Sequence, residues 1–140
     1  MGGTGGDKLF GGKGADTLAG DTGGDRLYGG KDNARDVFVY SDASDSPSDS
    51  SQTDKVFDFV SGVDVFDFRW MDADTSTDAH DDFAFSATGP AAHRVWTQSV
   101  DGGSLVMADN TGDALADLVV FVSDVSHLDV GDFWLSTPGG

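Results

Sequence analysis

The stretch GGTGGDKLFGGKGADTLAGDTGGDRLYGG, residues 2–30, decides the fold because three residue types return in it every nine positions. Each unit opens on a glycine, at Gly2, Gly11, Gly20 and Gly29. An aspartate follows five positions later, at Asp7, Asp16 and Asp25, and a leucine two positions after that, at Leu9, Leu18 and Leu27. Because internal repeats at a fixed period indicate a repeat architecture, this part of the chain predicts stacked, equivalent turns.

Within each unit the residue types divide into a turn and a very short strand. The first six residues are rich in glycine, which allows left-handed backbone conformations and lets several carbonyls point the same way. The next three residues place one leucine between two other residues, and we expect that leucine to point inward. Carbonyl oxygens and a carboxylate are hard ligands that suit Ca²⁺, whereas Mg²⁺ demands stricter octahedral geometry. The unit therefore predicts a calcium site in the turn.

The composition limits the classes of partner. The chain has 140 residues and a net charge of −17, and all 25 of its acidic residues are aspartate. Aspartate favours turns and cation binding over helices. The net charge argues against nucleic acid and anionic membrane surfaces as partners, and no apolar run is long enough to span a bilayer. Cysteine is absent, which excludes disulfides and thiolate metal sites.

The residues after the repeats predict a β-rich cap that continues the same core. Alternating apolar segments predict strands at 36–40, 54–59, 64–68, 82–86, 93–98, 104–108, 117–122 and 132–135. Phe57 and Phe66 are again nine residues apart, so we expect phenylalanine to replace leucine in a widening core. We predict an all-β fold: a parallel β-roll over residues 1–40, running into a C-terminal β-sandwich cap over 41–140, with one short helical turn in the loop at 41–52.

The nine-residue unit resembles the RTX nonapeptide G-G-x-G-x-D-x-U-x, a calcium-binding β-helix repeat. The segments DVFVYSDASDSPSDSSQTDKVFDFVSGVDVFDF, DDFAFSATGPAA, DNTGDALADLVVFV and DFWL are similar to the C-terminal domain that follows the repeats in serralysin-type metalloproteases, and mannuronan C5-epimerases carry related modules. The resemblance covers nearly the whole chain. It implies a β-roll in which two repeats make one turn of the coil and each ion lies between turns stacked on the same side.

The resemblance also implies the ligands. Asp7 and Asp25 would share one ion, and Asp16 and Asp36 a second one. The fourth unit departs from the pattern, because Asp32 replaces a glycine, Ala34 stands where the aspartate belongs, and Asp36 arrives two residues late. In the family, aspartates of the segment matching TDKVFDF bind calcium near the end of the roll. The complete predicted metal set is Asp7, Asp16, Asp25, Asp36, Asp54 and Asp58 with turn residues Gly3, Gly5, Gly12, Gly14, Gly20, Thr22, Gly29 and Lys31.

No catalytic motif is present in the sequence. His80, His93 and His127 are scattered, and none belongs to an H-E-x-x-H pair. The loop DNTGDALAD at 109–117 is similar to a D-x-[DN]-x-D-G calcium loop, but Ala114 stands where the turn glycine belongs and no glutamate follows, which favours a hydrogen-bonded hairpin turn. The chain is predicted not to be an enzyme.

We predict a module that folds on binding Ca²⁺ outside the cell and supports type I secretion and stability of a parent exoprotein. Its partners would be calcium ions and the secretion machinery, which would recognise the C-terminal VGDFWLSTPGG. We expect a secreted bacterial protein that is a monomer and does not insert into membranes. Met1 and the STPGG end are equally consistent with a fragment cut from a longer protein. The alternative is a carbohydrate-binding module for alginate. Trp70, Trp96 and Trp134 favour it, and repulsion between the negative charges of the protein and of alginate opposes it. A third possibility is a spacer segment of an adhesin.

Overall fold

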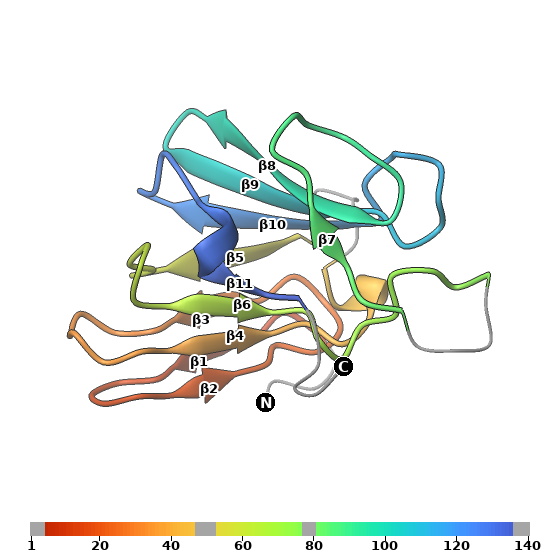
Figure 1. The fold of residues 1–140 in the computed structure, drawn as a ribbon. Helices are drawn as coiled ribbons and strands as arrows, with labels where there is room; N and C mark the ends of the chain where they lie inside the picture. The colour runs from red at the N-terminus through yellow and green to blue at the C-terminus, as the bar shows by residue number, and fades with distance from the viewer. Residues whose placement is uncertain (1–4, 47–52, 77–80, 136–140) are drawn as a thin grey trace.

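The computed structural model describes residues 5–46, 53–76 and 81–135, and these residues form an all-β fold of two facing sheets (Figure 1). The seven-stranded sheet has the strand order β1-β3-β5-β10-β9-β8-β7 and the four-stranded sheet has the order β11-β6-β4-β2. The strands are β1 (Lys8–Phe10), β2 (Thr17–Leu18), β3 (Arg26–Tyr28), β4 (Val37–Val39), β5 (Asp54–Phe57), β6 (Val65–Asp67), β7 (Ala84–Phe85), β8 (Arg94–Val100), β9 (Gly103–Ala108), β10 (Leu118–Ser123) and β11 (Phe133–Trp134).

The first six strands form the predicted parallel β-roll. Successive strands alternate between the two sheets, so each strand pairs in parallel with the next but one: β1 with β3, β3 with β5, β2 with β4, and β4 with β6. One turn of the coil therefore consists of two repeats. The strands contain only two to four residues because the glycine-rich turns begin again after each short apolar segment.

The rest of the chain completes both sheets. β10 pairs in parallel with β5 and then in antiparallel with β9, which pairs with β8, while β11 adds to β6 on the opposite sheet. The predicted strands at 82–86, 93–98, 104–108, 117–122 and 132–135 are all present, with bounds shifted by at most two residues. The roll and the predicted cap thus share both sheets.

The core lies between the sheets and changes from leucine to phenylalanine along the roll. Leu27 and Val56 are fully buried on the seven-stranded sheet, and Phe38 and Phe66 face them from the other sheet. The expectation that Phe57 fills the core was wrong. Val56 is the strand partner of Leu27, whereas Phe57 pairs with Tyr28 and stacks on its ring at 4.6 Å on the outer face.

Two short 3₁₀ turns accompany the strands. The first, at Ala43–Asp45, lies in the loop where one helical turn was predicted, and the second, at Val130–Asp132, precedes β11 and was not predicted. Among the described residues, no helix has the length and apolar character needed to cross a bilayer.

We expect Phe66→Ala to destabilise the calcium-loaded protein by about 3–5 kcal/mol, because it removes a large ring from the middle of the core. The Phe66 ring is fully buried and lies within 4.7–6.5 Å, between centroids, of five other aromatic rings. Urea unfolding at saturating calcium measures the change. Leu115→Ala is the control, because Leu115 is 67% exposed and its loss should change the free energy of unfolding by less than about 0.5 kcal/mol; equal effects would contradict this core.

Candidate metal centre

Three aspartates on the seven-stranded side are linked into a ladder through their backbones. Asp7, Asp25 and Asp54 each stand at or just before the start of a strand, at β1, β3 and β5. The N–H of Asp7 donates to Oδ1 of Asp25 at 2.8 Å, and the N–H of Asp25 donates to Oδ1 of Asp54 at 2.8 Å. The carboxylates of Asp25 and Asp54 are thereby each fixed to the preceding turn of the coil.

A second ladder of the same construction lies at the start of the four-stranded sheet. The N–H of Asp16 donates to Oδ1 of Asp36 at 3.0 Å, and the N–H of Asp36 donates to Oδ1 of Asp64 at 2.9 Å. The irregular fourth repeat therefore still brings Asp36 beside Asp16. Its two extra residues fit because Asp32, which replaces a glycine, caps the turn: its carboxylate accepts the N–H groups of Gly14 and Ala34.

The second oxygen of most of these carboxylates has no partner. Among the described residues, Oδ2 of five aspartates is buried and accepts no hydrogen bond: Asp7, Asp16, Asp25, Asp36 and Asp54. A buried carboxylate oxygen without a hydrogen bond is unfavourable, and native structures rarely leave such a group without a partner. Five of them in two rows offer oxygen ligands of the kind that a cation between the turns requires.

The glycines that open each unit make room for these oxygens. A Cβ at Gly20 would lie 2.3 Å from Oδ2 of Asp25, and a Cβ at Gly29 would lie 2.6 Å from Oδ2 of Asp36. A backbone oxygen approaches as well, because a Cβ at Gly11 would lie 2.7 Å from Oδ2 of Asp16 and 2.9 Å from the carbonyl oxygen of Gly29. The turns thus bring carboxylate and carbonyl oxygens together where a side chain would fill the space, which is the all-oxygen environment that Ca²⁺ prefers.

Burial and mutual repulsion disfavour the charged form of these carboxylates. Burial raises the pKa of Asp54 to about 7, the charge of Asp25 raises it further, and the hydrogen bond from the N–H of Asp25 opposes both. Burial is also the main cause that raises the pKa of Asp25, Asp36 and Asp64. A bound cation would reverse this effect by stabilising the charged form.

The ends of both ladders differ from the middle. Asp64, which the sequence analysis did not nominate, closes the second ladder: its Oδ2 accepts the N–H of Val60 at 2.8 Å. Ser46 closes the first one, because its hydroxyl accepts the N–H of Asp54 at 2.9 Å. The signal for Asp64 was available, since DVF at 64–66 repeats DVF at 36–38.

The other nominated residues occupy different places. Gly3 lies outside the described residues, while Gly5, Gly12, Gly14, Thr22 and Lys31 lie in the turns, where their role as carbonyl ligands stays a prediction. Asp58 is not brought to the ladder that contains Asp54. It follows the far end of β5 with a φ of 65° and lines a surface hollow together with Asp32 and Asp124.

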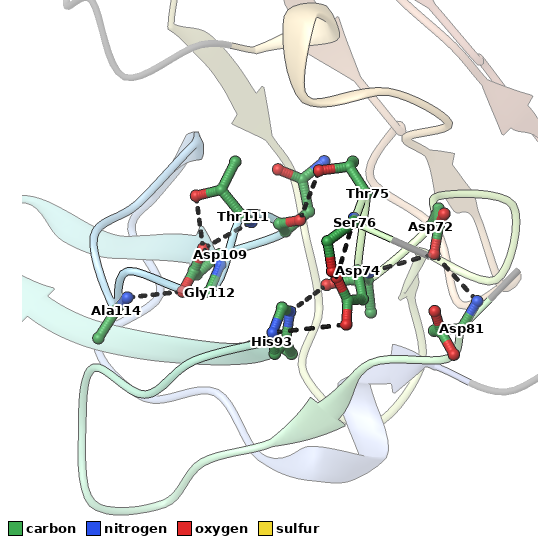
Figure 2. Close-up of polar contacts among 12 residues, drawn as sticks. Asp72, Asp74, Thr75, Ser76, Asp81, His93, Asp109, Thr111, Gly112 and Ala114 are labelled. Carbon is green, nitrogen blue, oxygen red and sulfur yellow. Dashed lines mark hydrogen bonds and ion pairs between the residues drawn. The ribbon is translucent and has the colours of Figure 1, made fainter. Parts of the chain in front are cut away.

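The acidic loop at 109–117 contrasts with the ladders. One carboxylate oxygen from each of Asp109, Asp113 and Asp117 lies within 4.8 Å of the others. However, both oxygens of Asp109 accept hydrogen bonds, Oδ1 from the N–H groups of Thr111 and Gly112 and Oδ2 from that of Ala114 (Figure 2). These bonds lower the pKa of Asp109 to about 2 although burial opposes them. Its carboxylate is thus satisfied as in the hydrogen-bonded turn predicted from the sequence.

The described histidines and tryptophans form no common site. Nδ1 of His93 lies 2.7 Å from the carbonyl oxygen of Ala73, and its Nε2 lies 3.7 Å from Asp74 (Figure 2). His127 is exposed and bonds to Asp129, and His80 lies outside the described residues. Trp96 is buried, whereas Trp70 is 58% exposed and Trp134 lies under the guanidinium of Arg69.

Comparison with known proteins supports the same fold. The chain is similar to the solution structure of the AlgE6R3 subunit of the Azotobacter vinelandii mannuronan C5-epimerase, with a TM-score of 0.64 and 16% identity over 96% of this chain and 80% of that chain. The AlgE6R2 subunit of the same organism's epimerase matches with a TM-score of 0.51 and 21% identity over 99% of this chain and 93% of that one. At these identities the likeness concerns the fold alone. No curated protein sequence matches the chain.

A family model describes almost the entire sequence. The model of the peptidase M10 serralysin C terminal matches residues 1–133 of the 140. This family comprises C-terminal accessory repeat domains of secreted proteins, and its repeats imply calcium binding in general. The chain belongs to the peptidase M10 serralysin C-terminal family.

Proposed function

We propose that this chain is a non-catalytic module that folds when calcium binds between the turns of its roll, outside the cell. The observation that carries the proposal is the pair of ladders in which Asp25, Asp36 and Asp54 each use Oδ1 to hold the neighbouring turn and leave Oδ2 buried without a partner. Family membership supports calcium as the ion. The residues that would hold it are Asp7, Asp25 and Asp54 on one side, and Asp16, Asp36 and Asp64 on the other.

The carboxylates themselves explain why folding and binding would be coupled. In the unfolded chain they are hydrated and far apart, whereas folding buries them in rows, where burial and then the neighbouring charges raise the pKa of Asp25 and Asp36. A divalent cation supplies the positive charge and the ligand positions that the buried oxygens lack. Each site adds about 2.7 kcal/mol when free calcium exceeds the dissociation constant a hundredfold, so a few sites rival the whole stability of a small domain.

This coupling suits a domain that leaves the cell before it folds. The chain contains no cysteine, so folding outside the cell requires no disulfide chemistry. We therefore propose an extracellular location and a role in supporting type I export and stability of a parent exoprotein. The C-terminal residues 130–140 would interact with the export machinery; residues 136–140 lie outside the described part of the chain.

The tryptophans give limited support to the alternative, a carbohydrate-binding module. Trp96 is 3% exposed and cannot contact a ligand without rearrangement. Trp70 and Trp134 both lie near the guanidinium of Arg69, at 5.7 and 4.6 Å from the ring centroids, and Arg69 also pairs with Asp67. Arg69 thus lies over one face of each of these two rings, and the three tryptophans form no common surface for a glycan.

We expect the protein to be largely unfolded in EGTA at pH 7.5 and to gain strand signal in circular dichroism as calcium is added. The physical reason is the cost of burying five unpartnered carboxylate oxygens without a cation. Equimolar titration with Mg²⁺ serves as the control and should produce less folding, because Mg²⁺ gives up its waters reluctantly. A cooperatively folded protein in EGTA would refute the proposal.

We expect Asp25→Asn to lower calcium affinity roughly tenfold or more, since Asp25 is shared by two neighbouring turns of the first ladder. Isothermal titration calorimetry measures the affinity. Asp101→Asn removes the same charge from the exposed turn between β8 and β9 and should leave the affinity within about twofold, because exposed charges are screened by solvent. If both variants lost affinity equally, the ladder would not be the site.

The raised pKa of Asp54 predicts opposite pH dependences with and without calcium. In the folded state the pKa of Asp54 is about 7, against an ordinary 3.8, so the folded protein binds this proton more tightly than the unfolded chain. Without calcium, the contribution of Asp54 to the free energy of unfolding is therefore present at low pH and is lost as the pH rises towards 7. In calcium-free buffer the folded fraction should therefore increase from pH 7.5 to 5.5. With calcium the affinity should fall over the same range, because protons compete with the ion.

Circular dichroism and calorimetry at the two pH values measure these effects. In Asp54→Asn the calcium-free protein should show a weaker pH dependence, because that titrating group is gone. A calcium-free protein that loses structure on acidification to pH 5.5 would contradict the assignment.

A further inference from the structure

The hydroxyl of Tyr40 is a buried polar group to which the proposed function gives no role. Tyr40 is fully buried, and its ring packs against those of Phe66 and Phe68, with centroids 6.5 and 5.8 Å away. Among the described residues, its hydroxyl is the only buried side-chain oxygen outside the aspartates that has no hydrogen-bond partner. Phenylalanine would fill the same space without the cost of burying a polar group. The hydroxyl therefore points to a polar contact that the aromatic core does not provide.

This hydroxyl faces the carboxylate of Asp54 across the core. Tyr40 follows β4 of the four-stranded sheet, where its N–H donates to the carbonyl oxygen of Asp67 at 3.0 Å, whereas Asp54 opens β5 of the seven-stranded sheet. The two side chains meet between the sheets: burial is the main cause that raises the pKa of Asp54, and the Tyr40 hydroxyl is among the groups that lower it. No aligned hydrogen bond joins them in the structure, and the hydroxyl and Oδ2 of Asp54 are both buried without a partner.

The surroundings of the hydroxyl make it a donor. Burial first, and then the charge of Asp54, raise the pKa of Tyr40 well above its ordinary value, and the charges of Asp25 and Asp45 act in the same direction. The hydroxyl therefore keeps its proton at neutral pH, and an ionised carboxylate can only accept. Oδ1 of Asp54 already accepts the N–H of Asp25 at 2.8 Å, so the acceptor that remains for Tyr40 is Oδ2.

We infer that Tyr40 is a positioning residue for the cation of the first ladder, because its hydroxyl donates to Oδ2 of Asp54 and orients that carboxylate as a ligand. The inference rests on the calcium-dependent folding proposed above and adds a residue of the opposite sheet to its site. Each carboxylate oxygen offers two lone pairs, so Oδ2 can accept this hydrogen bond and bind a cation at the same time. Tyr40 thereby connects the first ladder directly to the aromatic core between the sheets.

The test is calorimetric titration of Ca²⁺ into Tyr40→Phe, which removes one oxygen and keeps the ring in the core. We expect the calcium affinity to fall about tenfold, the usual effect of removing a group that orients a metal ligand. A hydroxyl that only filled space would give the opposite sign. Removing an unpartnered buried hydroxyl would leave the folded state as stable or more stable, and calcium binding that is coupled to folding would be as tight or tighter.

Tyr28→Phe is the matched control, because Tyr28 is the only other tyrosine in the chain. Its ring stacks between those of Phe10 and Phe57 on the outer face, away from Asp54. Loss of the Tyr28 hydroxyl should therefore change the calcium affinity by less than about twofold. Circular dichroism at saturating calcium verifies that both variants fold.

A double-mutant cycle and a spectroscopic signature separate positioning from packing. Asp54→Asn removes the carboxylate that Tyr40 would hold, so in this background Tyr40→Phe should lower the affinity by less than about twofold more. In calcium-saturated protein labelled with ¹³C at tyrosine Cζ, Asp54→Asn should shift the NMR resonance of Tyr40 and leave that of Tyr28 in place. The Tyr28→Phe variant assigns the two resonances.

The results that would overturn the inference are distinct from failure of the folding proposal. If Tyr40→Phe bound calcium as tightly as Tyr28→Phe, the hydroxyl would position no ligand, and calcium-dependent folding would stand. Losses of affinity that simply add in the double variant, or a Tyr40 resonance that is unchanged by Asp54→Asn, would place the hydroxyl out of contact with Asp54. If the wild-type protein bound no calcium, both proposals would fail.

Discussion

The roll depends on one device, an aspartate at the start of a strand whose two oxygens have different roles. Oδ1 accepts the N–H of the equivalent aspartate one turn earlier, so the side chain itself links consecutive turns. That bond orients Oδ2 into a space that the opening glycine leaves free, where it has no partner. The same residue thereby holds the turn in place and, in the proposed function, supplies a ligand oxygen to the cation. A longer glutamate would not present its oxygens at this distance from the backbone, which fits the exclusive use of aspartate in the chain.

The cap connects these local sites to the stability of the whole domain. β5 begins at Asp54, the last aspartate of the first ladder, and pairs with β10, which leads into the antiparallel strands. β6, which follows Asp64, pairs in the same way with β11. The two ladders therefore end on the strands that join roll and cap. Loss of an ion at a ladder would disturb the phenylalanine core between the sheets, so cooperative folding of the entire domain is the expected response.

The regular part of the roll could be predicted from the sequence, and the irregular part only in outline. Identical spacing of Gly, Asp and Leu fixed which turns stack, because nine residues make half a coil. The predicted strand register was wrong where the repeat spacing changed. Asp54 and Asp64 are ten residues apart and stand at the starts of β5 and β6. Val56 therefore points inward and Phe57 does not. Periodicity counted from Phe57 placed its ring in the core, whereas the ring lies on the outer face. Asp64 was missed because it lies 28 residues after Asp36, outside the nine-residue period, although the repeated DVF at 36–38 and 64–66 marks the two positions as equivalent.

The net charge of the chain does not describe its surface potential, because acidic and basic side chains lie on different parts of the fold. The carboxylates concentrate in the turns and loops, where strands begin and end, whereas the lysine and arginine side chains of the seven-stranded sheet stand on its outer face. Cations bound in the ladders would neutralise much of the negative charge closest to that face and so strengthen its positive potential. An argument from the total charge alone excludes anionic partners, but the field near a surface depends on the charges within about a Debye length of it. The segregation along the strands therefore determines which ligands the folded domain attracts.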